Sequence, residues 1–137
     1  MAITHHELCF GCGVANLFGL QLELEAAEGR IAGRFFVKQD HQGPPGFAHG
    51  GVIATALDEA MALLVHDEGV HAVTRRLEIE LLGPVPVGSF ATVEARIESR
   101  GDKQLVLGAE LRGEDPERPL ARASGTFAVL ALRRDAG

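Results

Sequence analysis

The chain has 137 residues and a formal net charge of −6, and 46% of its residues are hydrophobic. This length and composition favour a single globular domain spanning residues 1–137 and exclude a disordered chain. The negative charge argues against a nucleic-acid binder, which needs a basic face. The sequence shows neither a secretory signal nor an apolar run near the roughly 20 residues of a membrane span, so we expect a cytoplasmic protein without a membrane partner.

Alternating apolar and polar residues predict most of the secondary structure. Two strands come first, and a turn at Glu28 and Gly29 separates them. A loop rich in Gly and Pro follows, and then an almost wholly apolar helix that ends near Gly69. The expected strands cover residues 20–25, 30–37, 73–82, 90–98, 104–111 and 120–132, and the expected helix covers residues 50–66.

The connections between the later strands predict the fold class. Strands joined by hairpin-length links are antiparallel neighbours, and one helix on one face of such a sheet makes an α+β fold. The helix is apolar on nearly all sides, and Ala56, Ala60 and Leu63 lie away from its main apolar stripe. One sheet is therefore not expected to cover it. We expect a homo-oligomer, at least a dimer, in which a second chain covers the helix start near Gly50.

The helix start carries the most informative residues of the chain, His49, Gly50 and Gly51. The first N–H groups of a helix have no partner inside the helix, and glycines leave them accessible. A negative charge that develops on a substrate oxygen can be stabilised there. Asp58 lies two to three turns further along the same apolar helix, where a buried carboxylate is costly without a purpose or a partner. Donors and a carboxylate together indicate acyl chemistry.

Asp58 and Glu59 are neighbours in the sequence but fall on different faces of the expected helix. At about 100° per residue, Asp58 falls between Val65 and Ala62, whereas Glu59 falls on a separate, narrow polar arc. We therefore expect Asp58 to be enclosed and Glu59 to be solvated. The alternative is that Asp58 is an ordinary carboxylate at the margin of a solvent-facing arc, and the preceding His-Gly-Gly favours the functional interpretation.

The segment from His49 to Asp58 resembles the signature of the hotdog-fold acyl-CoA thioesterases, in which an Asp or Glu follows His-Gly-Gly nine positions after the His. It is most similar to the group that contains the phenylacetate-pathway thioesterases, their mammalian relatives and one branch of the 4-hydroxybenzoyl-CoA thioesterases. Residues 9–20 resemble the Cys-x-x-Cys-Gly…Asn-Pro-x-Gly-Leu opening of many members, and residues 73–88 resemble the strand after the helix. Leu81 replaces a frequent aromatic there.

The resemblance implies a long antiparallel sheet wrapped around one central helix, and an enzyme that hydrolyses an acyl- or aryl-CoA thioester to the free acid and CoA. It implies that the Gly50 amide polarises the thioester carbonyl. Asp58 would act as a general base on water or as a nucleophile through an anhydride. His49 would orient the loop or contact the thioester; alternatively, it is a helix-entry residue hydrogen-bonded to the backbone. The resemblance further implies that the site lies between subunits of a dimer or a dimer of dimers.

Further residues are candidates for substrate contact. Gly51 is the next residue at the helix start, and Gln42 stands one step before a position where several relatives use Asn or Gln. Thr74 aligns, counting back from Pro84, with a hydroxyl residue that holds the attacking water in some relatives; the alternative is an ordinary strand residue. CoA belongs to the substrate, so no separate cofactor is expected. Basic residues that could contact its phosphates, or simply be solvated, are Arg75, Arg76, Arg100, Lys103, Arg133 and Arg134.

Cys9 and Cys12 form one Cys-x-x-Cys pair, and His5 and His6 precede it. On paper these residues could complete a zinc set. The histidines come before the cysteines, however, and their spacing does not match a usual zinc-finger framework. We therefore expect a structural turn with two thiols and no metal.

Two other functions remain open at this point. A non-catalytic acyl-CoA-binding module would keep the fold and the pocket without hydrolysis, and the presence of Asp58 argues against it. A hotdog dehydratase or hydratase is faintly echoed by His41 and the following Pro-Pro-Gly. In those enzymes the Glu lies only a few residues after the last Pro-Gly, whereas thirteen positions separate Gly46 from Glu59 here.

Overall fold

A computed structural model describes residues 2–132 of the chain. Its helices are η1 (Gln39–His41), a short 3-10 helix, and α1 (Gly50–Asp67). Its strands are β1 (Glu23–Ala27), β2 (Arg30–Phe36), β3 (Val70–Leu81), β4 (Phe90–Arg100), β5 (Gln104–Arg112) and β6 (Pro119–Leu132). Arg133 and Arg134, two of the candidate contacts to CoA phosphates, lie outside the described residues. Within the described part of the chain, no helix is long and apolar enough to cross a membrane.

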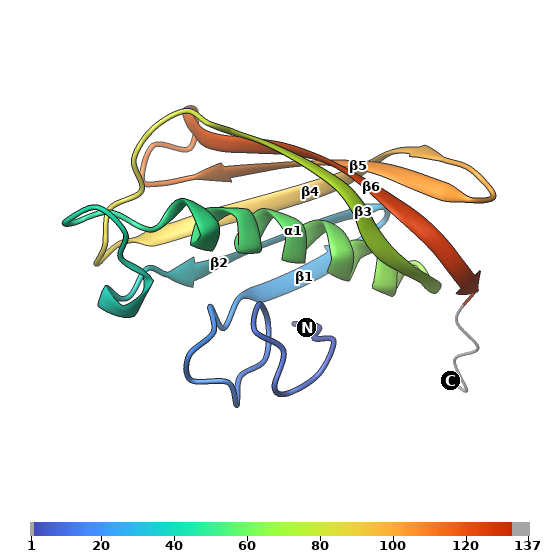
Figure 1. The fold of residues 1–137 in the computed structure, drawn as a ribbon, viewed down its shortest axis with the longest axis horizontal. Coiled ribbons are helices and arrows are strands. Elements are labelled where there is room, and N and C mark those ends of the chain that lie inside the picture. Colours follow the sequence, from blue (N-terminus) through green and yellow to red (C-terminus); the bar gives the residue numbers. More distant parts are fainter. Residues whose placement is uncertain (1, 133–137) are drawn as a thin grey trace.

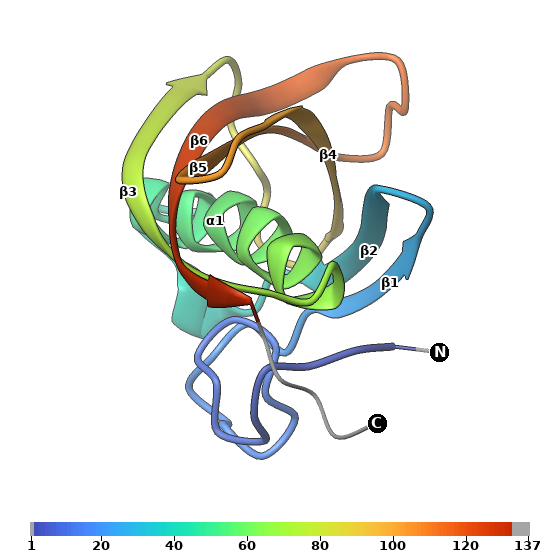
Figure 2. The same cartoon turned by 90° about the vertical axis from the view of Figure 1, so that its right-hand side faces the viewer.

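The strands form a six-stranded sheet in the order β1-β2-β4-β5-β6-β3, and every neighbouring pair is antiparallel. The sheet curves around α1, which runs along its concave face (Figures 1 and 2). Residues from both the helix and the sheet belong to one hydrophobic core. The expected α+β architecture, a long antiparallel sheet wrapped around a central helix, is confirmed.

Periodicity explains how the two layers meet. In β5, every second side chain is buried against the helix, namely Leu105, Leu107, Ala109 and Leu111. On α1, the residues that recur every three or four positions are buried in return, among them Ile53, Leu57, Met61 and Leu64. Burying a side chain of this size contributes about 1.5 to 3 kcal/mol, so these two stripes hold the helix against the sheet.

The first strand begins later than the alternation predicts, at Glu23 instead of residue 20. The backbone N–H groups of Leu20 and Leu22 donate to carbonyls of the N-terminal segment, at 2.9 Å each, and are thus not available to a strand neighbour. Between them, Gln21 has a φ of 53°, which is incompatible with a regular strand. The prediction fails here because tertiary hydrogen bonds override a local pattern.

The N-terminal segment, residues 5–22, lies on the open side of the curved sheet and packs against α1 (Figure 2). Ala56, Ala60 and Leu63 are fully buried within the single chain. The expectation that these three residues stay uncovered without a second subunit is therefore wrong. The sequence pattern could not show that a segment without regular secondary structure covers this face of the helix.

Candidate active site

The helix start leaves one backbone donor free. His49 has an extended backbone (φ −64°, ψ 140°) and caps α1, and its Nδ1 accepts a hydrogen bond from the Gly51 N–H at 2.8 Å. The His49 carbonyl accepts from Val52 and Ile53 at 2.9 and 3.2 Å. Among the described residues, no acceptor bonds the Gly50 N–H. The structure thus separates the two glycines, since Gly51 is held by the cap and Gly50 can donate to a ligand.

Buried His41 holds this cap in place from the preceding loop. Its carbonyl accepts from the His49 N–H at 2.8 Å, and its Nδ1 accepts from the Lys38 N–H at 3.0 Å. Because Nδ1 is an acceptor, Nε2 carries the proton, and it faces the Gly19 carbonyl at 3.3 Å. Burial lowers the pKa of His41. The imidazole is therefore neutral and acts as a structural link between three segments.

Gln42 closes the loop that leads to the helix. Its Oε1 accepts from the Gly46 N–H at 2.9 Å, and Gly46 has a φ of 87°, a conformation that glycine adopts without strain. The side-chain amide N of Gln42 remains on an exposed loop beside the helix start. The structure therefore gives Gln42 a loop-shaping contact and leaves its N–H₂ group available as a donor.

Asp58 is half-buried on α1, and its Oδ1 accepts a hydrogen bond from the Thr74 hydroxyl of β3 at 2.8 Å. Burial raises the pKa of Asp58, the bond from Thr74 opposes that rise, and the charge of Glu59 adds to it. A raised pKa makes a carboxylate a better proton acceptor. Thr74 is therefore more than an ordinary strand residue, because it fixes the orientation of this carboxylate.

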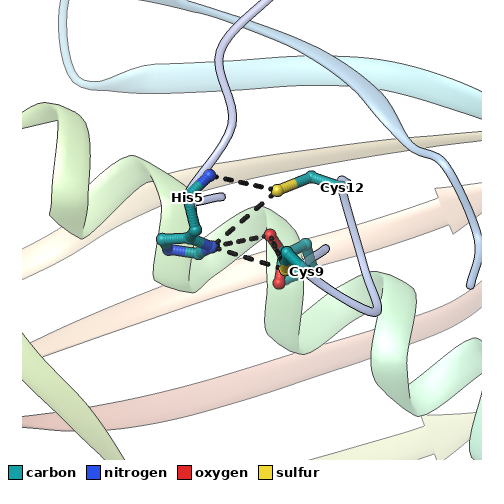
Figure 3. A group of neighbouring side chains, drawn as sticks. His5, Cys9 and Cys12 are labelled. Carbon is teal, nitrogen blue, oxygen red and sulfur yellow. Dashed lines mark hydrogen bonds and ion pairs between the residues drawn. The ribbon is translucent and has the colours of Figure 1, made fainter. Parts of the chain in front are cut away.

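Glu59 is more deeply buried than the half-buried Asp58, so the expectation that Glu59 is solvated is wrong. Glu59 is only 8% exposed. Its Oε2 lies 2.8 Å from His5 Nδ1 and 3.5 Å from Cys9 Sγ (Figure 3). Burial alone would raise the pKa of Glu59, but hydrogen bonds with His5 and with Cys12 bring it below its usual value. The N-terminal segment thus encloses the face of the helix that carries Glu59, which the helical periodicity of the sequence assigned to solvent.

The same contacts raise the pKa of His5. Hydrogen bonds with Cys12 and Glu59 raise the pKa of His5 to about 11. Sequence reasoning missed Glu59 as a buried functional group, and the available signal was the Cys-x-x-Cys motif with a nearby His. In the folded chain, the carboxylate of Glu59 contacts both the His and the first Cys of this motif.

Gly50 and Asp58 do not form one compact site within a single chain. They are eight residues apart on α1, which corresponds to about 12 Å along the helix axis. Both contact β3, but at distant points: Asp58 bonds Thr74, and a Cβ at position 50 would lie 3.4 Å from Leu81 Cδ1. β3 therefore connects the two halves of the candidate site, and it is an edge strand of the sheet.

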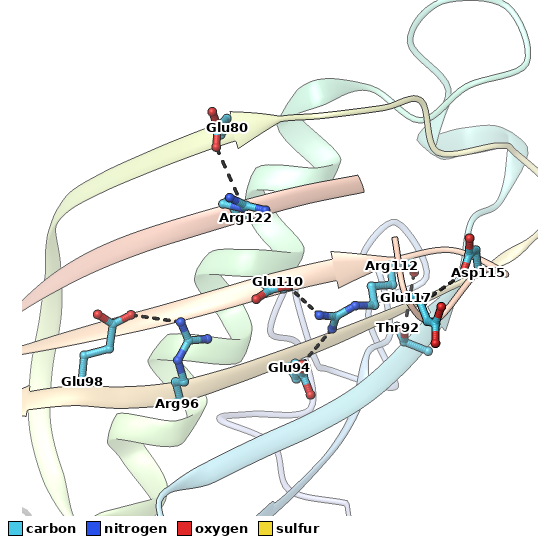
Figure 4. A network of polar contacts seen from close by, with 10 residues as sticks. All are labelled: Glu80, Thr92, Glu94, Arg96, Glu98, Glu110, Arg112, Asp115, Glu117 and Arg122. Carbon is cyan, nitrogen blue, oxygen red and sulfur yellow. Dashed lines mark hydrogen bonds and ion pairs between the residues drawn. The ribbon is translucent and has the colours of Figure 1, made fainter. Parts of the chain in front are cut away.

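The outer face of the sheet carries charged pairs and lies apart from these residues (Figure 4). Arg112 contacts Glu94 at 2.8 Å and Glu110 at 2.6 Å, and Arg122 lies 4.0 Å from Glu80. A hollow of about 630 Å³ on this face is lined by residues of β3, β4, β5 and β6, and its lining includes neither Gly50 nor Asp58. Exposed ion pairs such as that of Arg122 and Glu80 contribute about 0–1 kcal/mol each, and none of these charged residues belongs to the candidate site.

Comparison with known proteins identifies the family of the chain. The thioesterase superfamily matches residues 45–120, which include the helix start, Asp58 and Thr74. The acyl-coenzyme A thioesterase THEM5 of Mus musculus is 33% identical over 91 residues, which cover 66% of this chain but only 37% of that protein. The match thus spans well under half of this relative.

Two solved structures share the fold. A Streptococcus mutans protein bound to acetyl CoA has a TM-score of 0.77 and 24% identity, and the match covers 82% of this chain and 91% of that one. A mutant of the phenylacetic acid degradation protein PaaI from Thermus thermophilus has a TM-score of 0.75 and 25% identity, with 81% and 95% covered. By its sequence match and its architecture, the chain belongs to the thioesterase superfamily.

Proposed function

We propose that the protein is an acyl-CoA thioesterase that hydrolyses an acyl- or aryl-CoA thioester to a free acid and CoA. One observation carries this proposal: Asp58 is held by Thr74 at 2.8 Å on the same helix whose first N–H group, that of Gly50, has no acceptor among the described residues. A free donor and an oriented carboxylate are what attack on a carbonyl needs. The thioesterase names of relatives and the CoA-bound neighbour support the substrate class.

The reaction follows from these two groups. The Gly50 N–H donates to the thioester oxygen and stabilises the negative charge that develops on it. Asp58 accepts a proton from water as the water oxygen bonds the carbonyl carbon; the C–S bond then breaks, and the thiolate of CoA takes up the proton. The alternative, in which Asp58 attacks directly and an anhydride is hydrolysed, uses the same residues. His49 and Thr74 position the donor and the carboxylate.

We further propose that each site is shared between two chains. The donor lies about 3 Å from the carbonyl oxygen, and the base lies about 3 Å from the water that attacks the carbonyl carbon. Together these distances require the donor and the base to lie within roughly 8 Å of each other. The helix separates Gly50 and Asp58 of one chain by more than that. Gly50 of one protomer paired with Asp58 of another is not subject to this separation, and a site between subunits is also what the family resemblance implies.

The β3 edge offers a geometry for that dimer. A two-fold antiparallel pairing centred on Glu78 would place Leu77 opposite Ile79 and Arg76 opposite Glu80 of the second copy. It would also place Glu78 opposite its own copy, a like-charge pair that Arg76, 2.7 Å from Glu78 in each chain, offsets. Arg75 is a bulge, because Thr74 and Arg76 pair with consecutive residues of β6. Across this bulge, Thr74 meets the partner's Leu81, which brings Asp58 toward the partner's Gly50. Apolar and opposite-charge pairs across such a ladder contribute about 0.2–1 kcal/mol each.

The test is an assay of free thiol release over a panel of short, long and aromatic acyl-CoA substrates. A thioesterase releases CoA with at least one of them, and the Asp58→Asn variant does not. Saturable binding of acyl-CoA without thiol release would instead identify a binding module. Conversion of an enoyl-CoA by addition of water, again without thiol release, would identify a hydratase. The cytoplasmic location expected from the sequence stays part of this proposal.

A further inference from the structure

Four side chains with metal-binding chemistry meet beneath α1, and the proposed reaction uses none of them. His5, Cys9 and Cys12 come from the N-terminal segment, and Glu59 comes from the helix (Figure 3). One ligand atom from each of the four lies within 4.8 Å of all the others. The expectation of no metal depends on the order and spacing of these residues in the sequence, which do not show that the fold adds Glu59 to the set.

The distances between these atoms fit a single small ion. His5 Nδ1 lies 3.9 Å from the sulfur of Cys9 and 3.9 Å from that of Cys12, and it lies 2.8 Å from Glu59 Oε2. Cys9 Sγ lies 3.5 Å from the same carboxylate oxygen. Tetrahedral zinc with bonds of about 2.0–2.3 Å places its ligand atoms roughly 3.3–3.8 Å apart. Shifts of well under 1 Å at these four contacts bring the ligand atoms to that spacing.

The ligand types agree with the geometry. Thiolate sulfur, imidazole nitrogen and carboxylate oxygen are the three kinds of ligand that zinc takes from proteins, and Cys-x-x-Cys is a usual spacing for a zinc-binding pair. Four protein ligands make a closed set with no open coordination position. Such a set is typical of a structural site, which stabilises the fold without taking part in catalysis.

The segment is folded around the two sulfurs. The backbone N–H of His5 donates to Cys12 Sγ at 3.2 Å, and this contact fixes the position of the sulfur. The Cys9 carbonyl accepts from the Gly13 N–H at 2.8 Å, which closes the turn between the cysteines. A Cβ at Gly11 would come within 2.5 Å of Glu59 Cγ. The turn therefore rests directly on the carboxylate, with no room for a larger residue.

A hydrogen-bonded cluster alone is a weaker account of this arrangement. A buried carboxylate is satisfied by strong donors, and His5 supplies one. Thiols are weak donors and acceptors, so two of them around the same carboxylate add little as hydrogen-bond partners. As zinc ligands they bind as thiolates and contribute fully; their two negative charges balance the ion, and the set keeps the one negative charge of Glu59.

We propose that His5, Cys9, Cys12 and Glu59 bind one zinc ion, which fastens the N-terminal segment to α1 one residue from Asp58. The site is structural. It goes beyond the proposed thioesterase activity and does not depend on it, because neither Gly50 nor Asp58 is among its ligands.

The direct test is zinc content per chain of the full-length protein, purified under reducing conditions, incubated with excess Zn²⁺ and desalted. We expect about one zinc per chain, as for other structural sites. The chain has only two cysteines, so a thiol reagent reports on the site alone: both thiols are protected with zinc bound, and both react after a chelator removes it. Cobalt(II) in place of zinc should give the intense visible absorption of tetrahedral thiolate coordination.

Matched variants separate ligands from bystanders. His5→Ala and the double change of Cys9 and Cys12 to Ser should abolish stoichiometric zinc, and Glu59→Gln should weaken its retention against a chelator. His6→Ala and Asp58→Asn are the controls, since each removes a neighbouring group of the same kind, and both should keep one zinc. Zinc below about a tenth of an equivalent in the folded wild-type protein, or stoichiometric zinc that survives loss of both cysteines, would overturn the proposal.

Discussion

Replacing Gly50 by Pro removes the proposed carbonyl donor with little other change. Gly50 is the first residue of α1, the position where proline is most favoured in helices, and the preceding His49 has the extended ψ of 140° that a following proline requires. The N–H that is lost bonds no described residue. The fold should therefore tolerate the substitution, and circular dichroism and the melting temperature should stay close to those of the wild-type protein.

The catalytic effect should be large. Loss of one preorganised donor to a developing oxyanion costs about 100- to 1,000-fold in kcat, and KM should change much less, because the interaction is strongest in the transition state. The assay is thiol release with the best acyl-CoA of the panel. Gly50→Ala is the control: it keeps the N–H, and its Cβ would lie at an ordinary 3.4 Å from Leu81. If both variants lose activity equally, the amide hydrogen is not the cause and the donor role is refuted.

Mixing two inactive variants tests the shared site. A dimer of one Gly50→Pro chain and one Asp58→Asn chain contains one intact site, with Gly50 from one chain and Asp58 from the other. Random exchange of equal amounts makes half of all dimers mixed, so about a quarter of the wild-type activity should return. No recovery, with chain exchange shown by tagged subunits, would mean that the donor and the base of each site come from the same chain.

The other predictions concern the carboxylate and the assembly. Asp58→Asn should lower turnover by about two orders of magnitude or more. Burial raises the pKa of Asp58, so the ionised form is less favourable in the folded than in the unfolded chain and stability falls as pH rises through that pKa; the variant should therefore melt at a higher temperature at neutral pH. Thr74→Val removes the bond that lowers the pKa of Asp58, so the acid limb of kcat/KM should move to higher pH, whereas Thr74→Ser should keep it in place. Sedimentation at micromolar concentration should show a dimer or a dimer of dimers, and a fully active monomer would contradict the shared site.

Local features of the sequence were sufficient to predict the helix and the later strands. The helix is predicted over residues 50–66 and observed over Gly50–Asp67, because its start and end depend on neighbours in the sequence. His49 caps the first turn, and Gly69, with a φ of 80°, lies just beyond the last. The alternation of apolar and polar residues in β5 similarly predicts which face of the strand packs against the helix. The identification of the fold itself needed the family resemblance, since the same pattern is compatible with other α+β arrangements.

The environment of the two carboxylates could not be predicted in this way. A helical wheel gives the directions of Asp58 and Glu59 but not what lies along each direction. The segment that covers Glu59 has no periodic pattern, and its contact to the helix joins residues about 50 positions apart. The apolar residues Ala56, Ala60 and Leu63 were misread for the same reason, because the covering segment and the sheet together bury them within one chain.

The adjacent carboxylates of α1 therefore serve two surfaces. Successive residues of a helix point about 100° apart, so Asp58 reaches Thr74 on the β3 edge while Glu59 reaches His5 under the N-terminal segment. A defect at the proposed zinc ligands would act on Asp58 through the helix that carries both residues and through the charge of Glu59, which raises the pKa of Asp58. Loss of zinc should lower the melting temperature while a zinc-free chain that stays folded keeps thiol release, whereas Asp58→Asn should abolish thiol release with zinc still bound. Each proposal can thus fail without the other.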